Sequence, residues 1–460
     1  MDEVIARLER LVGGQRLRSG EALHPYTHDE SDVGPRQPLV AVEARSAEEV
    51  EAIVRLARET KTPVVPRGAG TGKSGGALAE RGGIVLSTAG MTAIREIDRR
   101  DLVAVVEPGV VTKTLQDAVE AQNLFYPPDP SSLDTSTLGG NAAHDAGGPR
   151  ALKYGVTRDY VLATETVLGT GERVRTGHRS IKGVAGYDLT ALLVGSEGTL
   201  GIFTELSLQL LPKPERVETA LLVYGGDEGE EQAIRSVDAL FGSGLLPRTC
   251  ELLDRPAMQA VRSRAPFAFP PDVAAALIVE VDGNEDGCAR DLRTLEAVCT
   301  RAGAAEVLLA QTPGQRAKVW ETRRLVSPSL RALRPFKMSE DVAVPRGRML
   351  ELVRAVRRLG QSLGLETAVY GHAGDGNLHV NLLFASRDDG AKVEAALAGV
   401  VAAAVQLGGT ITGEHGVGLA KKRFLSLEQS PALVAAQRRI KAALDPDGIL
   451  NPGKIFPDES

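Results

Sequence analysis

The sequence is poor in cysteine and in aromatic residues, and its charges are nearly balanced. Its 460 residues include three cysteines, Cys250, Cys288 and Cys299, and none of them stands in a CxxC pair. A disulfide framework, or an iron–sulfur cluster held by this chain alone, is therefore not expected. Aromatic residues make up 4% of the chain, and the formal net charge is −6 with acids and bases interspersed. These features argue against a nucleic-acid-binding protein, which needs a basic surface and stacking platforms for bases.

Long apolar segments are also missing. No run of about 18 apolar residues occurs, so no membrane span is expected. Residues 1–14 have the pattern of an amphipathic helix rather than that of a signal peptide, which predicts a cytoplasmic location. A chain of this length has a prior of two or three domains, and it can bury enough surface to fold without disulfides or metals.

Glycine, in contrast, is plentiful, with 50 residues, and three clusters of it stand out. The first, at 66–76, follows directly on a predicted strand; the others lie at 126–148 and 195–202. Glycine-rich loops offer consecutive backbone N–H groups with no side chain in the way, and such groups can cradle a pyrophosphate. Three of these loops spread over about 130 residues indicate an extended ligand. A dinucleotide fits this better than a mononucleotide.

The first glycine cluster admits other interpretations. A Walker A motif ending in Gly72-Lys73-Ser74 would need glycine at position 67, where the chain has Arg67. This argues against an ATP-binding P-loop protein, which would also be colourless when purified. Gly70, Gly72 and Gly75 satisfy the GxGxxG spacing of a Rossmann fold, but that match is weak on its own. A flexible turn without a ligand is the remaining alternative.

The histidines form the second candidate site. In residues 370–381, Asp375-Gly376 between apolar runs predicts a hairpin with a two-residue turn, which would place His372 directly opposite His379. Asn381 would share that face, with Tyr370 across from it. Two imidazoles so placed can converge on one divalent ion.

Glu414 and His415 stand side by side between glycines in residues 412–418. Because adjacent side chains usually point apart, one of them is expected to bind a metal while the other faces the substrate. Structural histidines are the alternative explanation. A zinc peptidase is disfavoured because no HExxH motif occurs.

Several motifs in order resemble one known family. PRGAGTGKSGG at 66–76, STLGGNAA and AGG within 136–148, KYGVTRDYV at 153–161 and KGVAGYDLTALLVGSEGTLGI at 182–202 are similar to the FAD-binding module of the vanillyl-alcohol oxidase superfamily. More narrowly, they resemble its D-lactate, glycolate and D-2-hydroxyglutarate dehydrogenase branch. The resemblance covers the chain from about residue 25 to its end. It implies an α+β fold with a two-subdomain FAD domain, an α+β substrate (cap) domain and a C-terminal segment that returns to the flavin.

The resemblance also implies which residues hold the cofactor. The first loop would bind the phosphates, the second would lie along the flavin, Glu197, Gly198 and Ile202 would lie near the adenosine, and the Asn of the C-terminal NPGK would return to the flavin. The complete set is Arg67, Gly68, Ala69, Gly70, Thr71, Gly72, Thr137, Gly139, Gly140, Gly147, Gly148, Glu197, Gly198, Ile202 and Asn451. Because the first loop lacks the histidine of covalent family members, non-covalent FAD is expected. His144 is assigned no role.

The family's active-site roles map onto the histidine segments. His372, His379 and Glu414 match its metal ligands, a set that suits Zn²⁺ or Mn²⁺, and His415 matches its catalytic base. The residues expected at the substrate are Arg323, Ser327, Lys337 and Asn381. Arg323, in a WxxR motif, would bind the substrate carboxylate. Lys337 is displaced by two positions from the family's lysine, which leaves a solvated charge as its alternative.

The expected enzyme is an FAD-dependent D-2-hydroxy-acid dehydrogenase that is metal-assisted and produces a 2-oxo acid. The alternative is a non-catalytic flavin-binding electron-relay subunit of a larger oxidase. The electron acceptor is open: a quinone, a flavoprotein or an iron–sulfur subunit; a homodimer is open as well. We divide the chain into an N-terminal helix and leading segment (1–37), an FAD domain (38–214), a substrate domain (215–410) and a segment that completes the active site (411–460).

Overall fold

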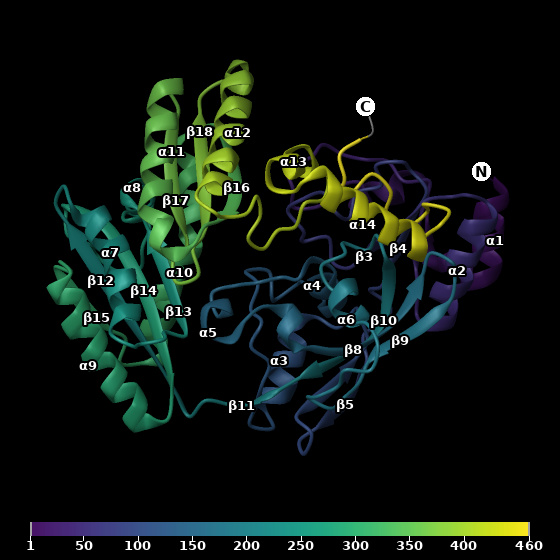
Figure 1. Cartoon of the computed structure of the whole chain (residues 1–460), viewed down its shortest axis with the longest axis horizontal. Coiled ribbons are helices and arrows are strands. Elements are labelled where there is room, and N and C mark those ends of the chain that lie inside the picture. The colour runs from purple at the N-terminus through teal and green to yellow at the C-terminus, as the bar shows by residue number, and fades with distance from the viewer. Residues whose placement is uncertain (1, 459–460) are drawn as a thin grey trace. The chain divides into compact units, whose positions relative to one another are not determined.

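A computed structural model describes residues 2–458 of the chain. It divides into two compact units, each built on sheets of its own (Figure 1). The first unit comprises Met1–Gly148, Gly155–Lys213 and Glu414–Ser460, and the second comprises Pro149–Tyr154 and Pro214–Gly413. The C-terminal segment therefore belongs to the same unit as the glycine loops. The four-segment division drawn from the sequence stays a prediction.

The first unit contains a small sheet in which a helix joins two strands that flank a third, parallel strand. Its strand order is β1-β2-β4-β3, and β4 pairs in parallel with both β2 and β3. Helix α2 (Ala47–Glu59) connects β2 to β3, and its N-terminus is capped by Ser46, whose hydroxyl accepts the Glu49 N–H. The strands are β1 (Leu17–Arg18), β2 (Val40–Glu43), β3 (Val64–Arg67) and β4 (Ile84–Ser87). Strand β3 ends where the first glycine loop begins.

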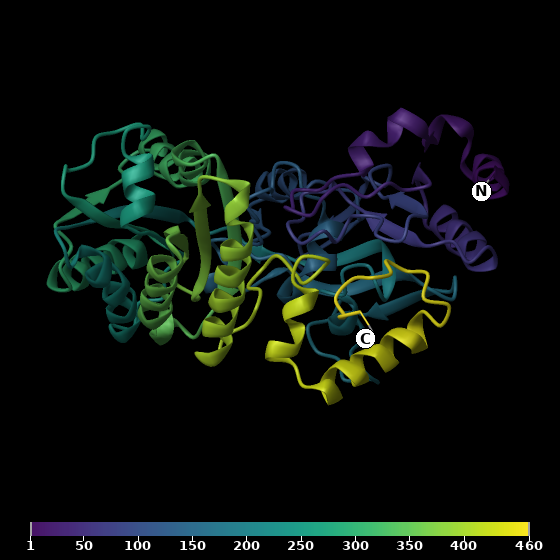
Figure 2. The ribbon, with the colours of Figure 1, turned by 90° about the horizontal axis from the view of Figure 1, so that it is seen from above.

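A second, antiparallel sheet completes the framework of this unit, in the order β5-β6-β10-β8-β9. Its strands are β5 (Ile94–Asp98), β6 (Val103–Val106), β8 (Val161–Leu168), β9 (Arg173–Gly177) and β10 (Gly201–Gln209), and β7 (Leu124–Phe125) pairs separately with β11 (Leu211–Pro212). The helices besides α2 are α1 (Asp2–Val12), α3 (Thr112–Glu120), α4 (Leu138–His144), α6 (Leu189–Leu193), α13 (Leu425–Glu428) and α14 (Pro431–Leu444). Helices α1 and α14 lie on opposite sides of this unit (Figure 2).

The second unit is built on a seven-stranded antiparallel sheet in the order β15-β12-β14-β13-β17-β18-β16 (Figure 1). The strands are β12 (Arg216–Gly225), β13 (Thr249–Leu253), β14 (Val273–Gly283), β15 (Glu306–Leu309), β16 (Phe336–Ala343), β17 (Glu366–His372) and β18 (Asn377–Phe384). The helices are α5 (Ala151–Tyr154), α7 (Gly229–Gly242), α8 (Arg255–Val261), α9 (Glu285–Arg301), α10 (Pro313–Leu333), α11 (Met349–Leu363) and α12 (Gly390–Gln406). Apolar side chains of α8 and α10 share one core with residues of one sheet face, among them Ile278, Tyr370 and Leu383.

The β17–β18 hairpin corrects the predicted register. His372 pairs with Asn377 and Tyr370 pairs with His379, so the connection has four residues rather than two. Asn381 accordingly faces Ala368, not Tyr370. The wider loop is held by a contact outside the hairpin, since the Gly374 N–H donates to the Cys250 carbonyl of β13 at 3.1 Å. Because the register shift is an even number of residues, both histidines still lie on one face.

No helix within residues 2–458 is long and apolar enough to cross a membrane. The longest, α10, has 21 residues, but it carries several arginines along its length. Helix α12 is more apolar and has 17 residues, too few for a typical bilayer.

Candidate functional site

The three glycine loops line one cavity of about 300 Å³ in the first unit. Of the predicted cofactor residues, Gly148 and Asn451 do not line it and all the others do: Arg67, Gly68, Ala69, Gly70, Thr71, Gly72, Thr137, Gly139, Gly140, Gly147, Glu197, Gly198 and Ile202. Glu414 and His415 line the same cavity. Residues that are far apart in the sequence are thus brought together as the extended-ligand hypothesis requires.

The walls of this cavity leave little room for side chains, which fits a dinucleotide cradle. A Cβ at Gly68 would stand 2.3 Å from the Thr137 hydroxyl oxygen. Gly70 has a φ of 77°, in the left-handed region that favours glycine. Thr137 caps helix α4 by accepting the Gly140 N–H at 3.3 Å, so the second loop opens directly into a helix N-terminus. Backbone N–H groups at such a terminus favour an anion.

Arg67 is a buried cation at the start of the first loop. Its Nη2 donates to the carbonyls of Pro25 and His28 at 3.0 and 2.9 Å, and its guanidinium lies over the Tyr26 ring. Its Nη1 is buried and has no partner among the described residues. Burial lowers the pKa of Arg67. A buried donor without a partner is costly, and a phosphate oxygen in the cavity would satisfy it.

Asn451 joins two loops instead of lining the cavity. Its side-chain N–H₂ donates to the carbonyls of Gly76 and Glu197, at 2.9 and 2.7 Å. Lys454 donates to the Leu78 carbonyl and to the Asn451 side chain. Burial lowers the pKa of Lys454 to about 8. The C-terminal NPGK motif thus fixes the first and third glycine loops to each other.

His144, which the sequence left without a role, lies at the end of α4 and lines the cavity. Its Nδ1 is buried without a hydrogen-bond partner among the described residues. Ideal Cβ positions on Gly76 and Gly416 would both come within about 3 Å of its ring. The imidazole therefore fills the space that these glycines leave open.

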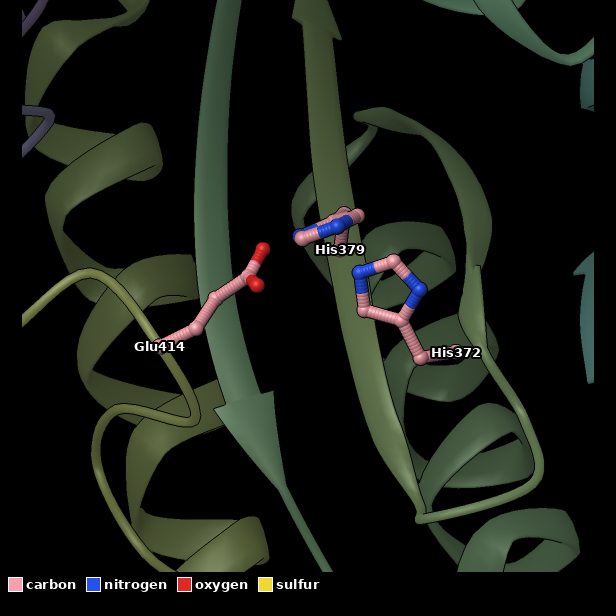
Figure 3. A group of neighbouring side chains, drawn as sticks. All are labelled: His372, His379 and Glu414. Carbon is pink, nitrogen blue, oxygen red and sulfur yellow. The ribbon is translucent and has the colours of Figure 1, made fainter. Parts of the chain in front are cut away.

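The predicted metal ligands form a group in the structure. His372, at the end of β17, and His379, on β18, have ring centroids 5.4 Å apart and planes inclined by 80°. Glu414 directly follows Gly413, and its carboxylate points toward the two rings (Figure 3). Each of the three side chains offers a ligand atom, and these atoms all lie within 4.8 Å of one another. Two imidazoles and one carboxylate are a donor set that fits Zn²⁺ or Mn²⁺.

A buried carboxylate that the sequence analysis missed orients His372. Glu251, on β13, accepts a hydrogen bond from His372 Nδ1 at 2.5 Å and another from Arg323 Nε at 2.7 Å. Burial alone would raise the pKa of Glu251, but the charges of His372 and Arg323 lower it to about 2. Glu251 therefore stays ionised, and with Nδ1 engaged the Nε2 of His372 is the nitrogen that could bind a metal ion.

A second missed carboxylate, Asp341 on β16, lies 4.0 Å from His379 Nδ1. It accepts hydrogen bonds from the Asn377 amide, the Thr412 hydroxyl and the Gly413 N–H, at 2.5, 3.0 and 2.9 Å. The backbone immediately before Glu414 is thereby fixed to the strand that pairs with the strand of His379. In the sequence, Glu251 is the one charged residue of its strand, whereas Asp341 stands beside Glu340 in a mixed strand and carries no distinguishing sign.

The predicted substrate residues lie on α10 and on the strands β16 and β18. Arg323 stacks on Tyr370, with its guanidinium carbon 4.7 Å from the ring centroid. Its Nη atoms have no partner among the described residues, so one edge of the guanidinium is available to an acid. Ser327 lies one turn further along α10 and accepts a hydrogen bond from Lys337 Nζ at 2.8 Å. Lys337 is thus partly buried and engaged, rather than a solvated charge.

Asn381 and His415 complete the predicted set. Asn381 is fully buried, its amide donates to the His379 carbonyl at 2.9 Å, and its Oδ1 has no partner in the described part of the chain. His415 lines the cavity, with its Nε2 3.7 Å from the Glu414 carboxylate. One imidazole nitrogen of His415 therefore faces the carboxylate of Glu414.

Known proteins resemble the chain over nearly its whole length. Residues 38–177 match the FAD binding domain, and residues 213–455 match the C-terminal domain of FAD linked oxidases. Glycolate oxidase subunit GlcD of Bacillus subtilis (strain 168) is 41% identical over 433 residues, which cover 94% of this chain and 92% of that one. The chain belongs to the FAD-linked oxidases. The predicted family is confirmed, and with it an FAD-using oxidoreductase.

Other relatives of this FAD-linked oxidase carry related names. The D-lactate dehydrogenase of Anaerostipes hadrus is 36% identical and covers 98% of this chain and 97% of its own length. The D-2-hydroxyglutarate dehydrogenase of Stutzerimonas stutzeri (strain A1501) is 33% identical and covers 98% of both. Among solved structures, p-cresol methylhydroxylase with bound substrate has a TM-score of 0.81 at 18% identity, over 99% of this chain and 97% of that one. This structural likeness confirms the predicted fold.

Proposed function

We propose that this FAD-linked oxidase is a metal-assisted D-2-hydroxy-acid dehydrogenase that converts glycolate, D-lactate, D-2-hydroxyglutarate or an acid of that class to the 2-oxo acid. The observation that carries the proposal is the group of His372, His379 and Glu414, with Glu251 joining His372 to Arg323. A metal site and a carboxylate-binding arginine that share one buried glutamate suit a substrate whose hydroxyl and carboxylate lie on adjacent carbons. The names of the relatives point to the same class of acid.

In this proposal Arg323 binds the substrate carboxylate through its Nη atoms. Glu251 holds the Nε side of the guanidinium, so the remaining edge is presented in a fixed orientation. Paired N–H donors of this kind match the two oxygens of a carboxylate. Lys337 and Ser327 would extend the polar surface beside Arg323, and Asn381 would offer its unpaired Oδ1 to the substrate.

His372, His379 and Glu414 would hold the divalent cation. Such an ion, Zn²⁺ or Mn²⁺, acts as a Lewis acid that lowers the pKa of a bound hydroxyl. His415 would accept the hydroxyl proton at Nε2, the nitrogen that faces Glu414. FAD, when bound, would supply the acceptor for the hydride of the hydroxyl-bearing carbon, so that the acid loses one hydride and one proton, which are two electrons and two protons in all.

FAD would be held without a covalent bond, by the glycine loops and Arg67. Acid precipitation of the purified protein is expected to release the flavin into the supernatant. The electrons would pass on to a quinone, a flavoprotein or an iron–sulfur subunit, since this chain has no cysteine arrangement for its own cluster.

The test is anaerobic bleaching of the bound flavin by a panel of D- and L-2-hydroxy acids of increasing size. We expect rapid bleaching by at least one D-acid or by glycolate, and none by the L-enantiomers. The matched control is Arg323→Lys, which keeps the charge but loses the paired donors. No bleaching by any member of the panel would contradict the proposal and favour an electron-relay subunit.

A further inference from the structure

The carboxylate of Glu197 is bound to the backbone just after the predicted base. It accepts the Val417 N–H at 2.7 Å through Oε1 and the Gly418 N–H at 2.8 Å through Oε2. Glu197 is 5% exposed, so these charge-assisted hydrogen bonds are shielded from water. The family resemblance places Glu197 near the adenosine, but the contacts of its side chain lie in the segment that carries Glu414 and His415.

The backbone of Glu197 is itself tightly fixed. Its φ is 52°, a left-handed conformation that is uncommon for a residue with a side chain. Its N–H donates to the Ala143 carbonyl at 2.7 Å, and its own carbonyl accepts the Asn451 amide at 2.7 Å. An uncommon backbone conformation persists when the surroundings determine it from several sides. Both backbone polar groups and both carboxylate oxygens of Glu197 are occupied within the first unit.

The segment that Glu197 holds accepts only glycine at two positions. Gly416 has a φ of 79°, and a Cβ there would stand 2.9 Å from Glu197 Oε1 and 3.0 Å from His144 Nδ1. Gly418 has a φ of 50°, and a Cβ there would stand 2.2 Å from the Ser74 carbonyl oxygen. That carbonyl also accepts the N–H groups of residues 419 and 420, at 2.8 and 3.0 Å. The segment is therefore pinned between Glu197 and the first glycine loop.

From this geometry we infer that Glu197 is a positioning residue for catalysis. Its carboxylate fixes residues 416–418, and so sets the direction in which the two preceding residues, Glu414 and His415, leave the backbone. Glu197 in this way connects the wall of the FAD cavity to the metal ligand and the base. The inferred effect of Glu197 on turnover rests on the proposed function, whereas its inferred effect on residues 416–418 does not.

Hydrogen–deuterium exchange of the full-length, flavin-loaded protein tests the first half of this inference. In the wild type, the amides of Val417 and Gly418 should exchange slowly. In Glu197→Ala both bonds are lost, and exchange in the peptide 414–421 should be faster by about tenfold or more. Glu197→Gln keeps one acceptor oxygen and should give an intermediate value. Glu205→Gln, a change on a surface ion pair of β10, is the matched control and should match the wild type.

Metal titration and steady-state kinetics of the same variants test the second half. With FAD content unchanged, Glu197→Gln should weaken Zn²⁺ or Mn²⁺ binding and lower kcat by about tenfold, while KM changes little. Should Glu197→Ala fail to fold, Glu197→Gln carries the test alone.

Three results would overturn the inference. The first is loss of FAD with unchanged exchange in 414–421, which would make Glu197 an adenosine contact. The second is no change in exchange at all. The third is faster exchange with unaltered metal affinity and kcat, which would make Glu197 merely structural. If the wild type oxidises no 2-hydroxy acid, the proposed function fails, and the exchange and metal measurements still decide the role of Glu197.

Discussion

The glycine-lined cavity of the first unit and the proposed metal and carboxylate site, whose histidines lie on the sheet of the second unit, would recognise their ligands in different ways. The cavity offers mainly backbone N–H groups, which require glycines so that a ligand can approach closely. The sheet site uses ionisable side chains of strands and of α10, oriented by the buried carboxylates of Glu251 and Asp341. Recognition by backbone N–H groups tolerates ligands of different chemistry. Recognition by a network of charged side chains is specific, but it depends on each side chain of the network.

Except at Glu197, which is inferred to connect the two sites, variants at one site should therefore spare the function of the other. The largest effect is expected at the predicted base. His415→Ala should lower kcat by about 10²–10⁴-fold, because general-base catalysis supplies a factor of that size. Flavin content and metal content should remain those of the wild type, as measured by visible absorbance and elemental analysis. Wild-type turnover in this variant would show that another group takes the proton.

The carboxylate-binding arginine should give the next largest effect. Arg323→Lys keeps a positive charge but loses the planar pair of N–H donors, so kcat/KM should fall by about 10–100-fold. Steady-state kinetics with the best acid from the bleaching panel measures this loss. Arg324 is an exposed neighbour on the same helix, so Arg324→Lys is the control and should leave kcat/KM unchanged. Equal losses in both variants would indicate a general disturbance of α10.

Substitution of Glu251 tests whether the carboxylate that holds His372 and Arg323 contributes to metal binding. Glu251→Gln should weaken metal binding by about 10–100-fold, as is typical when the partner of a ligating histidine is removed, while FAD is retained. Unchanged metal affinity would show that His372 needs no orienting carboxylate.

The low pKa of Glu251 also predicts how stability depends on pH. The pKa is about 2 in the folded protein, below the ordinary value of 4.5. Its contribution to the free energy of unfolding is therefore fully present above pH 4.5 and declines as the pH falls toward 2. Acid unfolding curves of Glu251→Gln should show less of this decline than those of the wild type.

The smallest effect is expected in the glycine cavity. Gly70→Ala puts a side chain at a φ of 77°, which costs about 1–2 kcal/mol, and should weaken FAD binding several-fold to tenfold. Metal content should not change. Gly82→Ala, at a comparable φ of 65° with no neighbour within 4 Å, is the matched control for backbone strain alone. Equal loss of FAD in both variants would argue that the position of Gly70 in the cavity wall does not contribute to FAD binding.

The two sites also differ in how far the sequence predicts them. The glycine loops carry their signal locally, since a close backbone approach demands glycine wherever it occurs, so nearly every predicted cofactor residue lines the cavity. The histidines were recognisable from their spacing even though the register was wrong by two residues. An even shift keeps side chains on the same face, so the error did not separate His372 from His379.

What the sequence could not predict depends on contacts between distant segments. Glu251 meets His372 only because β13 pairs with β17, and Asp341 meets Gly413 only because β16 lies beside the returning chain. The hydrogen bonds from the N–H groups of residues 417 and 418 to Glu197 join positions more than 200 residues apart. No local pattern encodes these pairs, and they are the contacts that orient the site.

The most direct measurement for the metal site is flavin bleaching after the metal has been removed. Holoenzyme treated with a chelator should keep its yellow colour, lose bleaching by the preferred D-acid, and recover it when Zn²⁺ or Mn²⁺ is added back. The His379→Ala variant should not recover under the same treatment. Full-speed bleaching of metal-free protein would contradict the account, because His372, His379 and Glu414 would then have no part in the reaction.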